Sequence, residues 1–484
     1  MRSVTDRVFH YNSIALTEVL LVAFTCLIGS IIMRSVIYGN GTLFYLTIIG
    51  FAFVIGCLIP AEYVIISILI LFQLNPIIPK HEIGLVELNV YDIFYVVLAT
   101  RALFSILTKQ GSLPRTYSVF ALSFFLIWCI CSTANAYNMT QYKNWVQMNV
   151  SLVRFIEYAS AALFVPTLID SPQKIHKIFI AFIATSVVQV IISVICYAIY
   201  FITGKILLYG PLFVDYSGGK LGRLSGIYGD PATLGEVLLL PFLLSLLMHE
   251  AAFSKISVTY PFILIIGIIF TRTRSAILGL FASLIALLIQ RPVIGKEKYV
   301  AIGLTLISIL VVIFTMQITG FENNLQGFFR VEVDDNITSR VALNIEFLNM
   351  FMSSPFLGLG WTGSGFNKTV NAAASLYIHI LADLGISGFI LLLGFFVALL
   401  YDSFTLLKYA KTQEGMITAR WINLSTLAFL GISFGDITFY GGSEVTSFFF
   451  ITWGLLQAAI GMERKLLNNK LNYNAINAIP QDVK

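Results

Sequence analysis

The chain has 484 residues, of which 58% are hydrophobic and only 11% are charged, and its mean hydropathy is +0.86. Soluble domains carry about 25% charged residues, so this composition excludes an ordinary water-soluble globular protein, and no nucleic-acid partner is expected. Repeated apolar runs of roughly 17 residues or more predict an all-α polytopic membrane protein with about 12–14 transmembrane helices.

The predicted spans, in chain order, are 13–33, 42–59, 62–78, 89–107, 117–134, 148–168, 177–201, 232–249, 256–271, 275–290, 298–317, 375–401, 418–434 and 445–463. The first run lacks a small-residue cleavage site, so we expect it to be retained rather than removed as a signal peptide. We expect a single transmembrane domain over 1–463, followed by a basic cytoplasmic tail over 464–484.

The distribution of basic residues predicts the orientation of these spans. With the N-terminus inside, 17 of the 30 lysines and arginines fall on the cytoplasmic side, in short connections and in the two termini, so both termini are expected to be cytoplasmic. The five cysteines all lie within predicted spans, so no disulfide or zinc framework is expected. The cytoplasmic connections contain no G-x-x-x-x-G-K-[ST] motif, which argues against an ATP-driven pump.

Two outward connections are long, 202–231 and 318–374, and loops of this length are usually functional. The outward connections also carry arginines that the positive-inside bias works against. An anionic ligand held at this face would explain their presence. These arginines are Arg223, Arg272, Arg274, Arg330 and Arg340.

The first long loop ends in "GRLSGIYGDPATLGE", in which Arg223 lies among glycines that let the backbone approach a ligand closely. Asp230 is predicted to be the N-cap of the next helix, with Pro231 at its first position. The functional interpretation makes Arg223 a ligand contact and Asp230 a neighbour of the substrate. The alternative is a flexible loop with one solvated arginine.

A tight turn, "FTRTRSAILG", places Arg272 and Arg274 at the membrane surface, with Arg274 beside the N-terminus of a span. Both the guanidinium groups and the helix dipole favour an anion there. The alternative is interfacial anchoring, in which the side chains reach lipid phosphates.

The second long loop contains "SRVALNIEFLNMFMSS", which predicts an interfacial amphipathic helix capped by Ser339 and led by Arg340. This helix could serve packing alone, or it could cover a site at the lipid surface. Arg330 has no surrounding motif and is a weaker candidate. The short acidic run after it is typical of a solvated segment, and no metal site is predicted. The apolar positions at helical spacing are Val341, Ile345, Leu348 and Phe351.

Ionisable residues inside spans are a further set of candidates, because each is costly in lipid and must face protein or water. Arg154 and Glu157 share one helical face and predict a structural ion pair, with a substrate-facing role as the alternative. Ser375, His379 and Asp383 follow at four-residue spacing and predict a polar stripe, which is either a buried contact or a cavity wall.

Four segments, in order, resemble the successive motifs of the O-antigen ligase and polymerase superfamily. They are "GRLSGIYGDPATLGE", "TRTRSAILGL", "SRVALNIEFLNMFMSSPFLGLGWTGSGF" and "SLYIHILADLGISGF". The resemblance covers about 220–390. It implies a membrane glycosyltransferase of the GT-C kind in a bacterial inner membrane, acting outside the cytoplasm on a glycan carried by undecaprenyl pyrophosphate.

The resemblance also implies roles for individual residues. Arg223, Arg274 and Arg340 fall on the family's arginine positions, and Asp383 falls on the acidic position of the last motif. One departure concerns the family's His-Asn pair, which is associated with ligases. This chain has Ala374 and Ser375 there, which favours a repeat-unit polymerase over a ligase.

A mechanism without ATP is consistent with this assignment, because a sugar pyrophosphate carries its own leaving group. Arginines would stabilise the departing diphosphate, a carboxylate would accept the acceptor's proton, and a single displacement at C1 would invert the anomeric centre. No cofactor is expected; a flippase and a chain-length regulator are candidate partners. A ligase and a lipid-linked oligosaccharide flippase remain the alternative functions. The candidate bases are Asp230, Glu236, Asp383, Asp436 and Glu444.

Overall fold

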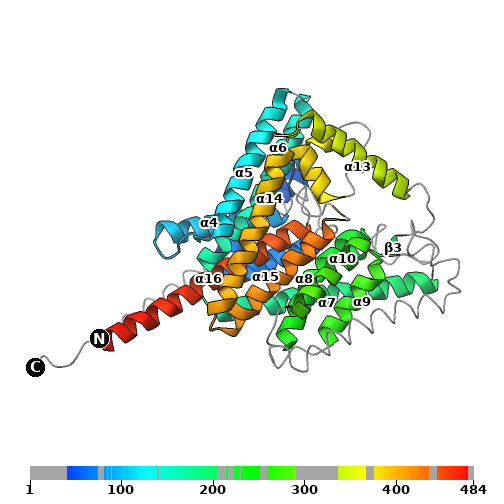
Figure 1. The fold of residues 1–484 in the computed structure, drawn as a ribbon. Helices are drawn as coiled ribbons and strands as arrows, with labels where there is room; N and C mark the ends of the chain where they lie inside the picture. Colours follow the sequence, from blue (N-terminus) through cyan, green and yellow to red (C-terminus); the bar gives the residue numbers. More distant parts are fainter. Residues whose placement is uncertain are drawn as a thin grey trace, which may run out of the picture.

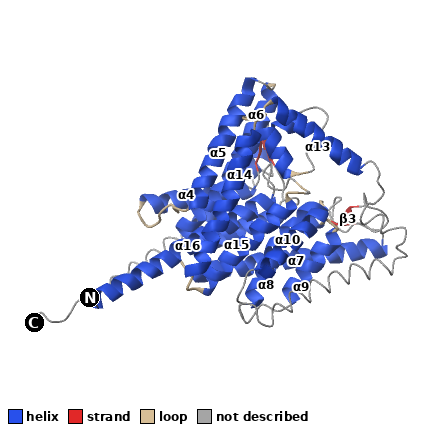
Figure 2. Ribbon diagram, viewed as in Figure 1, coloured by secondary structure: helices blue, strands red, loops and turns tan. Residues whose placement is uncertain are grey.

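The computed structural model describes residues 41–74, 81–83, 86–88, 90–138, 141–203, 214–215, 223–228, 230–250, 259–289, 336–366, 375–434, 436 and 444–477. Within this part the chain is helical apart from short turns and two small antiparallel strand pairs (Figure 2). The predicted spans 13–33 and 298–317 and the candidate Arg330 lie outside the described residues.

Each predicted span in the described part overlaps a helix, which confirms the all-α polytopic fold class. Strands β1 (His81–Ile83) and β2 (Val86–Leu88) form one pair, and β3 (Val214–Asp215) and β4 (Arg223–Leu224) form the other. The helices are α2 (Gly41–Leu58), α3 (Ala61–Leu74), α4 (Val90–Leu107), α5 (Tyr117–Asn135), α6 (Tyr142–Leu168), α7 (Pro172–Thr203), α8 (Pro231–Glu250), α9 (Thr259–Thr271), α10 (Arg274–Ile289), α13 (Asn336–Ser353), α14 (Leu376–Tyr409), α15 (Gln413–Ile432) and α16 (Glu444–Asn477).

Six of the described helices are long and apolar enough to cross a bilayer: α5, α6, α7, α8, α14 and α16. Four shorter apolar helices accompany them, within α2, α3, α9 and α10. Helix α5 leaves Phe120, Phe124, Ile127 and Ile130 at least half exposed along one face. Such a continuous apolar stripe is unusual on a protein surrounded by water, and it suits contact with lipid.

The helices share two ends, which we call the motif end and the opposite end. At the motif end, the hydroxyl of Thr273 between α9 and α10 donates to the carbonyl of Pro231 at the start of α8 (2.9 Å). The amide of Leu376 at the start of α14 donates to the carbonyl of Ser433 after α15 (3.0 Å). In Figure 1, β3 lies on the right, toward the motif end, and the free end of α16 extends to the left.

At the opposite end, the start of α5 meets the second half of α14, where the hydroxyl of Ser118 donates to Asp402 (2.6 Å). The amide of Lys411, before α15, donates to Glu463 of α16 (2.8 Å). Arg115 and Arg464, two basic residues predicted to be cytoplasmic, also lie here. The structure thus separates the predicted cytoplasmic connections from the segments that carry the motifs.

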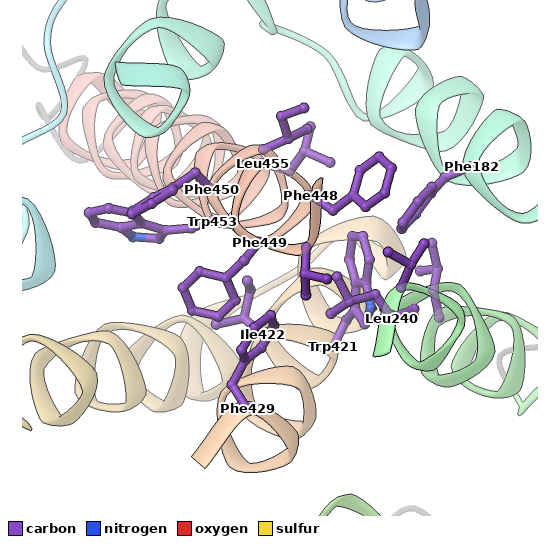
Figure 3. Packing of buried hydrophobic residues seen from close by; sticks show 14 of the residues in the cluster. Phe182, Leu240, Trp421, Ile422, Phe429, Phe448, Phe449, Phe450, Trp453 and Leu455 are labelled. Carbon is purple, nitrogen blue, oxygen red and sulfur yellow. Dashed lines mark hydrogen bonds between the residues drawn. The ribbon is translucent and has the colours of Figure 1, made fainter. Parts of the chain in front are cut away.

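A large aromatic core holds the bundle together around α15 and α16 (Figure 3). Phe448 packs on Phe182 of α7, with ring centroids 5.3 Å apart. The indole of Trp421 donates to the carbonyl of Leu240 beside a proline in α8 (2.9 Å), which ties α15 to α8. Buried aromatic residues of this size stabilise the core through their area and ring contacts, and they fix the relative positions of the helices whose ends form the candidate site.

Candidate functional site

Asp230 caps helix α8, as predicted. Its carboxylate accepts hydrogen bonds from the amide of Thr233 (2.8 Å), from the hydroxyl of the same residue (2.7 Å) and from the amide of Ala232 (3.3 Å). Pro231 occupies the first helical position, where its missing N–H costs nothing. The carboxylate therefore fixes the start of α8 at the motif end.

The turn between α9 and α10 places two arginines beside this cap. Arg272 has a φ of 51°, a left-handed conformation that a non-glycine residue adopts only at some cost, and it allows the reversal within two residues. Arg274 is the first residue of α10, and its side chain is exposed. The bond from Thr273 to Pro231 joins this turn to the start of α8. Two guanidinium groups thus lie near two helix N-termini.

A buried hydrogen bond joins the same two segments one turn deeper. The hydroxyl of Ser275 donates to Oε1 of Glu236 (2.8 Å), and both residues are at least 96% buried. Oε2 of Glu236 has no hydrogen-bond partner among the described residues. Asp436 and Asp230 lie close enough to act electrostatically on the Glu236 carboxyl. A buried carboxyl group, one oxygen of which makes no hydrogen bond within the described residues, therefore lies beneath the arginine turn.

Arg223 belongs to the same end by its backbone. It lies in β4, opposite Asp215 of β3, and β4 packs against α7, α8 and α9. The next described turn, Gly226–Tyr228, contacts α7 and α8. Three of the predicted segments, around Arg223, Asp230 and Arg272–Arg274, are thus brought together.

The fourth segment forms a helix that is broken just after the predicted polar stripe of Ser375, His379 and Asp383. Gly385 interrupts the helix with φ 68° and ψ −175°. Backbone groups freed by the break bond to the glycine-rich loop that precedes α14: Gly360 donates to the carbonyl of Asp383 (2.8 Å), and Ile386 donates to that of Pro355 (2.8 Å). Satisfying these groups internally is essential at membrane depth.

Side chains of α5 donate hydrogen bonds to further backbone carbonyl groups at this break. Trp128 donates to the carbonyl of Leu384 (2.9 Å), and the hydroxyl of Ser132 donates to that of Asp383 (3.1 Å). A methyl group on Gly385 would lie 2.3 Å from the carbonyl oxygen of Phe356. The glycine at position 385 is therefore explained by the close approach of the Phe356 backbone.

Asp383 is fully buried at this break. Its Oδ1 accepts from the amide of Ser364 (2.7 Å), and its Oδ2 lies 3.3 Å from Nε2 of His379. The hydroxyl of Ser364 lies 3.4 Å from the same histidine nitrogen. Ser375 is also buried, and its hydroxyl donates to the carbonyl of Ser433 (3.1 Å). Of the two interpretations of this stripe, the structure supports the buried polar contact.

Helix α13 differs in detail from its prediction. It begins at Asn336, four residues before the start predicted at Arg340, so Ser339 lies within the helix and does not cap it. The buried face carries Phe347 and Met350, which pack on α14. Two residues of the predicted apolar face are exposed, Ile345 at 53% and Leu348 at 41%, as an interfacial helix requires. The helix thus has two apolar faces, one for protein and one suited to lipid.

Arg340 lies in the first turns of α13, on the end that projects away from α14 (Figure 1). The helical repeat puts position 340 on the side that carries Leu343 and Phe347. Phe347 packs on the ring of His379, with centroids 5.0 Å apart. The backbone at Arg340 is therefore linked through α13 to the broken helix.

Arg154 and Glu157 lie halfway along α6, apart from the other candidates. Arg154 acts electrostatically on Glu157, and so does Asp92 of α4, which the sequence analysis did not identify. One turn earlier, Ser151 accepts from the indole of Trp361 (3.2 Å), so this part of α6 supports the glycine-rich loop.

Ser275 and Ser364 also belong to these contacts, although their sequence context did not predict it. Each is a lone serine whose role depends on a partner 39 or 15 residues away. The described residues contain no group of three or more His, Cys, Asp or Glu side chains arranged to hold a metal ion.

The fold and this polar end define a multi-pass helical membrane protein. Residues 260–393 match the family model described as O-antigen ligase, which supports, over that segment, the resemblance to the O-antigen ligase and polymerase superfamily. Members of this family are glycosyltransferase-like enzymes, and the family implies lipid-linked glycan substrates. The matched segment includes Arg272, Arg274, Arg340 and Asp383, whereas Arg223 and Asp230 precede it. No curated protein matched the chain in a sequence comparison.

Proposed function

We propose that this protein polymerises oligosaccharide repeat units carried on undecaprenyl pyrophosphate, by metal-independent inverting glycosyl transfer at the extracytoplasmic face of the membrane. The observation that carries the proposal is the motif end itself. There, the hydrogen bonds from Thr273 to Pro231 and from Ser275 to Glu236 hold an arginine turn over a buried carboxyl group.

The arginines would bind the diphosphate. Arg272 and Arg274 lie beside the N-termini of α8 and α10, where the helix dipoles add to the positive potential. Arg223 would approach from β4, and Arg340 from α13. Fixed cations at a surface of low dielectric stabilise a charge that grows as the leaving group departs.

In the proposed step, an acceptor hydroxyl oxygen bonds to C1 of the donor sugar as the bond between C1 and the diphosphate oxygen breaks. The electron pair of that bond leaves with undecaprenyl diphosphate, and the hydroxyl proton passes to a carboxylate. The product is lengthened by the transferred glycan, and the anomeric centre is inverted because one displacement occurs.

The hydrogen bonds of the candidate carboxylates reduce the number that could accept the acceptor's proton. Asp230 uses its carboxylate to cap α8, and Asp383 uses both oxygens within the broken helix. Glu236 keeps one oxygen without a hydrogen bond among the described residues, and Asp436 lies near it. We therefore propose that Glu236 or Asp436 accepts the proton, and that Asp383 and His379 position the loop that faces the substrate.

The test is polymerisation by purified protein in liposomes that contain a lipid-linked repeat unit. A ladder of products is expected from the unaltered protein, and its loss from Arg223→Ala, Arg274→Ala and Arg340→Ala. Lys143→Ala, an exposed lysine at the start of α6, is the matched control and should keep the ladder. Full activity in all three arginine variants would refute the mechanism.

A ligase that transfers finished glycan to another acceptor is the second candidate, because the matching family model carries the ligase description. Ser375 occupies one of the two positions at which the family's ligases carry the His-Asn pair, and its hydroxyl donates a hydrogen bond to the carbonyl of Ser433. Transfer to an added non-lipid-carrier acceptor without a ladder would favour the ligase. Movement of the lipid-linked unit across the bilayer without any transfer would favour a flippase.

A further inference from the structure

A second polar site lies at the opposite end of the molecule. A surface cavity of about 1170 Å³ is enclosed by the turn between α2 and α3, the end of α4, the linker 108–116, the end of α6 and the second half of α16. Helix α16 runs from the motif end to this cavity. Its rise between Glu444 and Gly461 is about 25 Å, so the cavity lies roughly one bilayer core away from the start of α16.

The cavity carries an excess of positive charge. Five basic residues line it, against two acidic ones, Glu62 and Asp170. Both acids are already paired: Asp170 with Lys174 at 2.8 Å and Glu62 with Lys177 at 3.1 Å. The basic lining residues are Arg101, Arg115, Lys174, Arg464 and Lys465.

Two of these cations are built into the wall. Arg101 donates to the carbonyls of Gly56 and Ile59 at the end of α2, which fixes its guanidinium in place. Arg464 of α16 donates to the carbonyl of Arg115 in the linker (3.4 Å). Neither Arg115 nor Lys465 has an ion-pair partner among the residues that the structure describes. Their charges are available to a ligand.

An apolar surface adjoins the charged lining. Ile106 and Leu113 line the cavity, as does Phe104, which is 65% exposed. Further along the same face of α4, Leu103 and Leu107 are 53% and 79% exposed. A ligand that fills the cavity can therefore place an anionic group among the cations and hydrocarbon chains along α4.

We propose that this cavity binds the phosphate group of an anionic phospholipid in the leaflet opposite the motif end. Basic pockets between transmembrane helices commonly hold such headgroups, and guanidinium groups match phosphate geometry. The apolar face of α4 favours a lipid over free phosphate as the source of that group. The proposal does not depend on the glycosyl transfer proposed above.

The test is native mass spectrometry of the delipidated, detergent-solubilised chain titrated with dioleoylphosphatidylglycerol, with dioleoylphosphatidylcholine or with inorganic phosphate. Arg115→Gln with Lys465→Gln removes the two available charges, and both side chains are exposed, so the fold should persist. Lys408→Gln with Lys411→Gln is the control, because these exposed lysines lie at the same end but do not line the cavity.

Tighter binding of the anionic lipid than of the neutral one is expected. A surface charge contributes roughly fivefold in affinity, so the cavity variant should lose about thirtyfold and the control should change little. Inorganic phosphate serves as a second probe of the same site. If its binding saturates, competes with the lipid and is lost in the cavity variant, the result supports this site with a free anion as its ligand. Equal binding of both lipids, or equal losses in the two double variants, would overturn the proposal.

Discussion

The hydroxyl of Ser275 donates a 2.8 Å hydrogen bond to Oε1 of Glu236, and neither side chain is more than 4% exposed. This contact joins the first turn of α10 to the second turn of α8. It therefore connects two segments that resemble separate family motifs, and it holds the turn that carries Arg272 and Arg274 against the cap at Asp230. A carboxyl group buried in this way depends on its few polar contacts, because burial without a partner is costly.

Replacing Ser275 with alanine should lower the free energy of unfolding by about 1–3 kcal/mol, because it removes the hydrogen-bond donor to Oε1 of the buried Glu236 carboxyl group. The same variant should reduce glycan transfer, since the arginine turn loses its anchor. Thermal unfolding in detergent and the liposome ladder measure the two effects.

Ser283→Ala is the matched control in the same helix. Ser283 is also fully buried, but its hydroxyl bonds only within α10, to the carbonyl of Leu280 (2.8 Å). The Ser283→Ala substitution should therefore lower the free energy of unfolding less than Ser275→Ala does, and it should leave glycan transfer unchanged. Equal effects of the two substitutions would show that the bond to Glu236 has no special role.

Much of the fold could be predicted from periodicity and charge. The span predicted at 232–249 corresponds to α8, which runs over Pro231–Glu250 in the structure. The predicted cap at Asp230 and the predicted start at Pro231 are also confirmed. These features depend on local rules, namely the length of apolar runs and the side chains that satisfy the first amides of a helix.

The break in α14 could not be predicted in the same way. Gly385 follows an apolar, helix-compatible run, and a lone glycine is tolerated in a helix. The break is stable because Gly360, Pro355 and Trp128 supply hydrogen bonds from elsewhere in the chain. The protein-facing side of α13, with Phe347 and Met350, could not be predicted for a similar reason, since contact with α14 decides which of its two apolar faces is covered.

Gly385→Ala should strongly destabilise the protein, by several kcal/mol, because φ is 68° and the added methyl group would meet the backbone oxygen of Phe356. Gly394→Ala, in the regular part of the same helix, meets no atom within 4 Å. It should be neutral or stabilising by up to about 1 kcal/mol. Thermal unfolding of both variants in one detergent compares them. Similar losses would show that the break is not required for the fold.

Asp230→Asn separates the capping role of this residue from a role for its charge. Asparagine caps helices about as well as aspartate, so the free energy of unfolding should change by only about a few tenths of a kcal/mol. Asp230→Ala should cost about 1 kcal/mol, because the Thr233 and Ala232 amides lose their acceptor. If the asparagine variant folds normally but transfers no glycan, the carboxylate acts on substrate or proton. If it remains active, the residue serves only the start of α8.

Arg272→Gly tests the arginine turn without straining it. The residue has a φ of 51°, which glycine adopts readily, so the turn should form and the unfolding temperature should change little. The guanidinium is lost, however, and an arginine that binds a diphosphate through charge-assisted hydrogen bonds contributes about 1.5–3 kcal/mol. Transfer should therefore fall roughly ten- to a hundredfold at fixed substrate. Arg272→Lys keeps the charge and should recover part of the rate. A glycine variant with full activity and normal stability would show that Arg272 does not contact the diphosphate, and it would leave Arg274 as the cation that this turn presents.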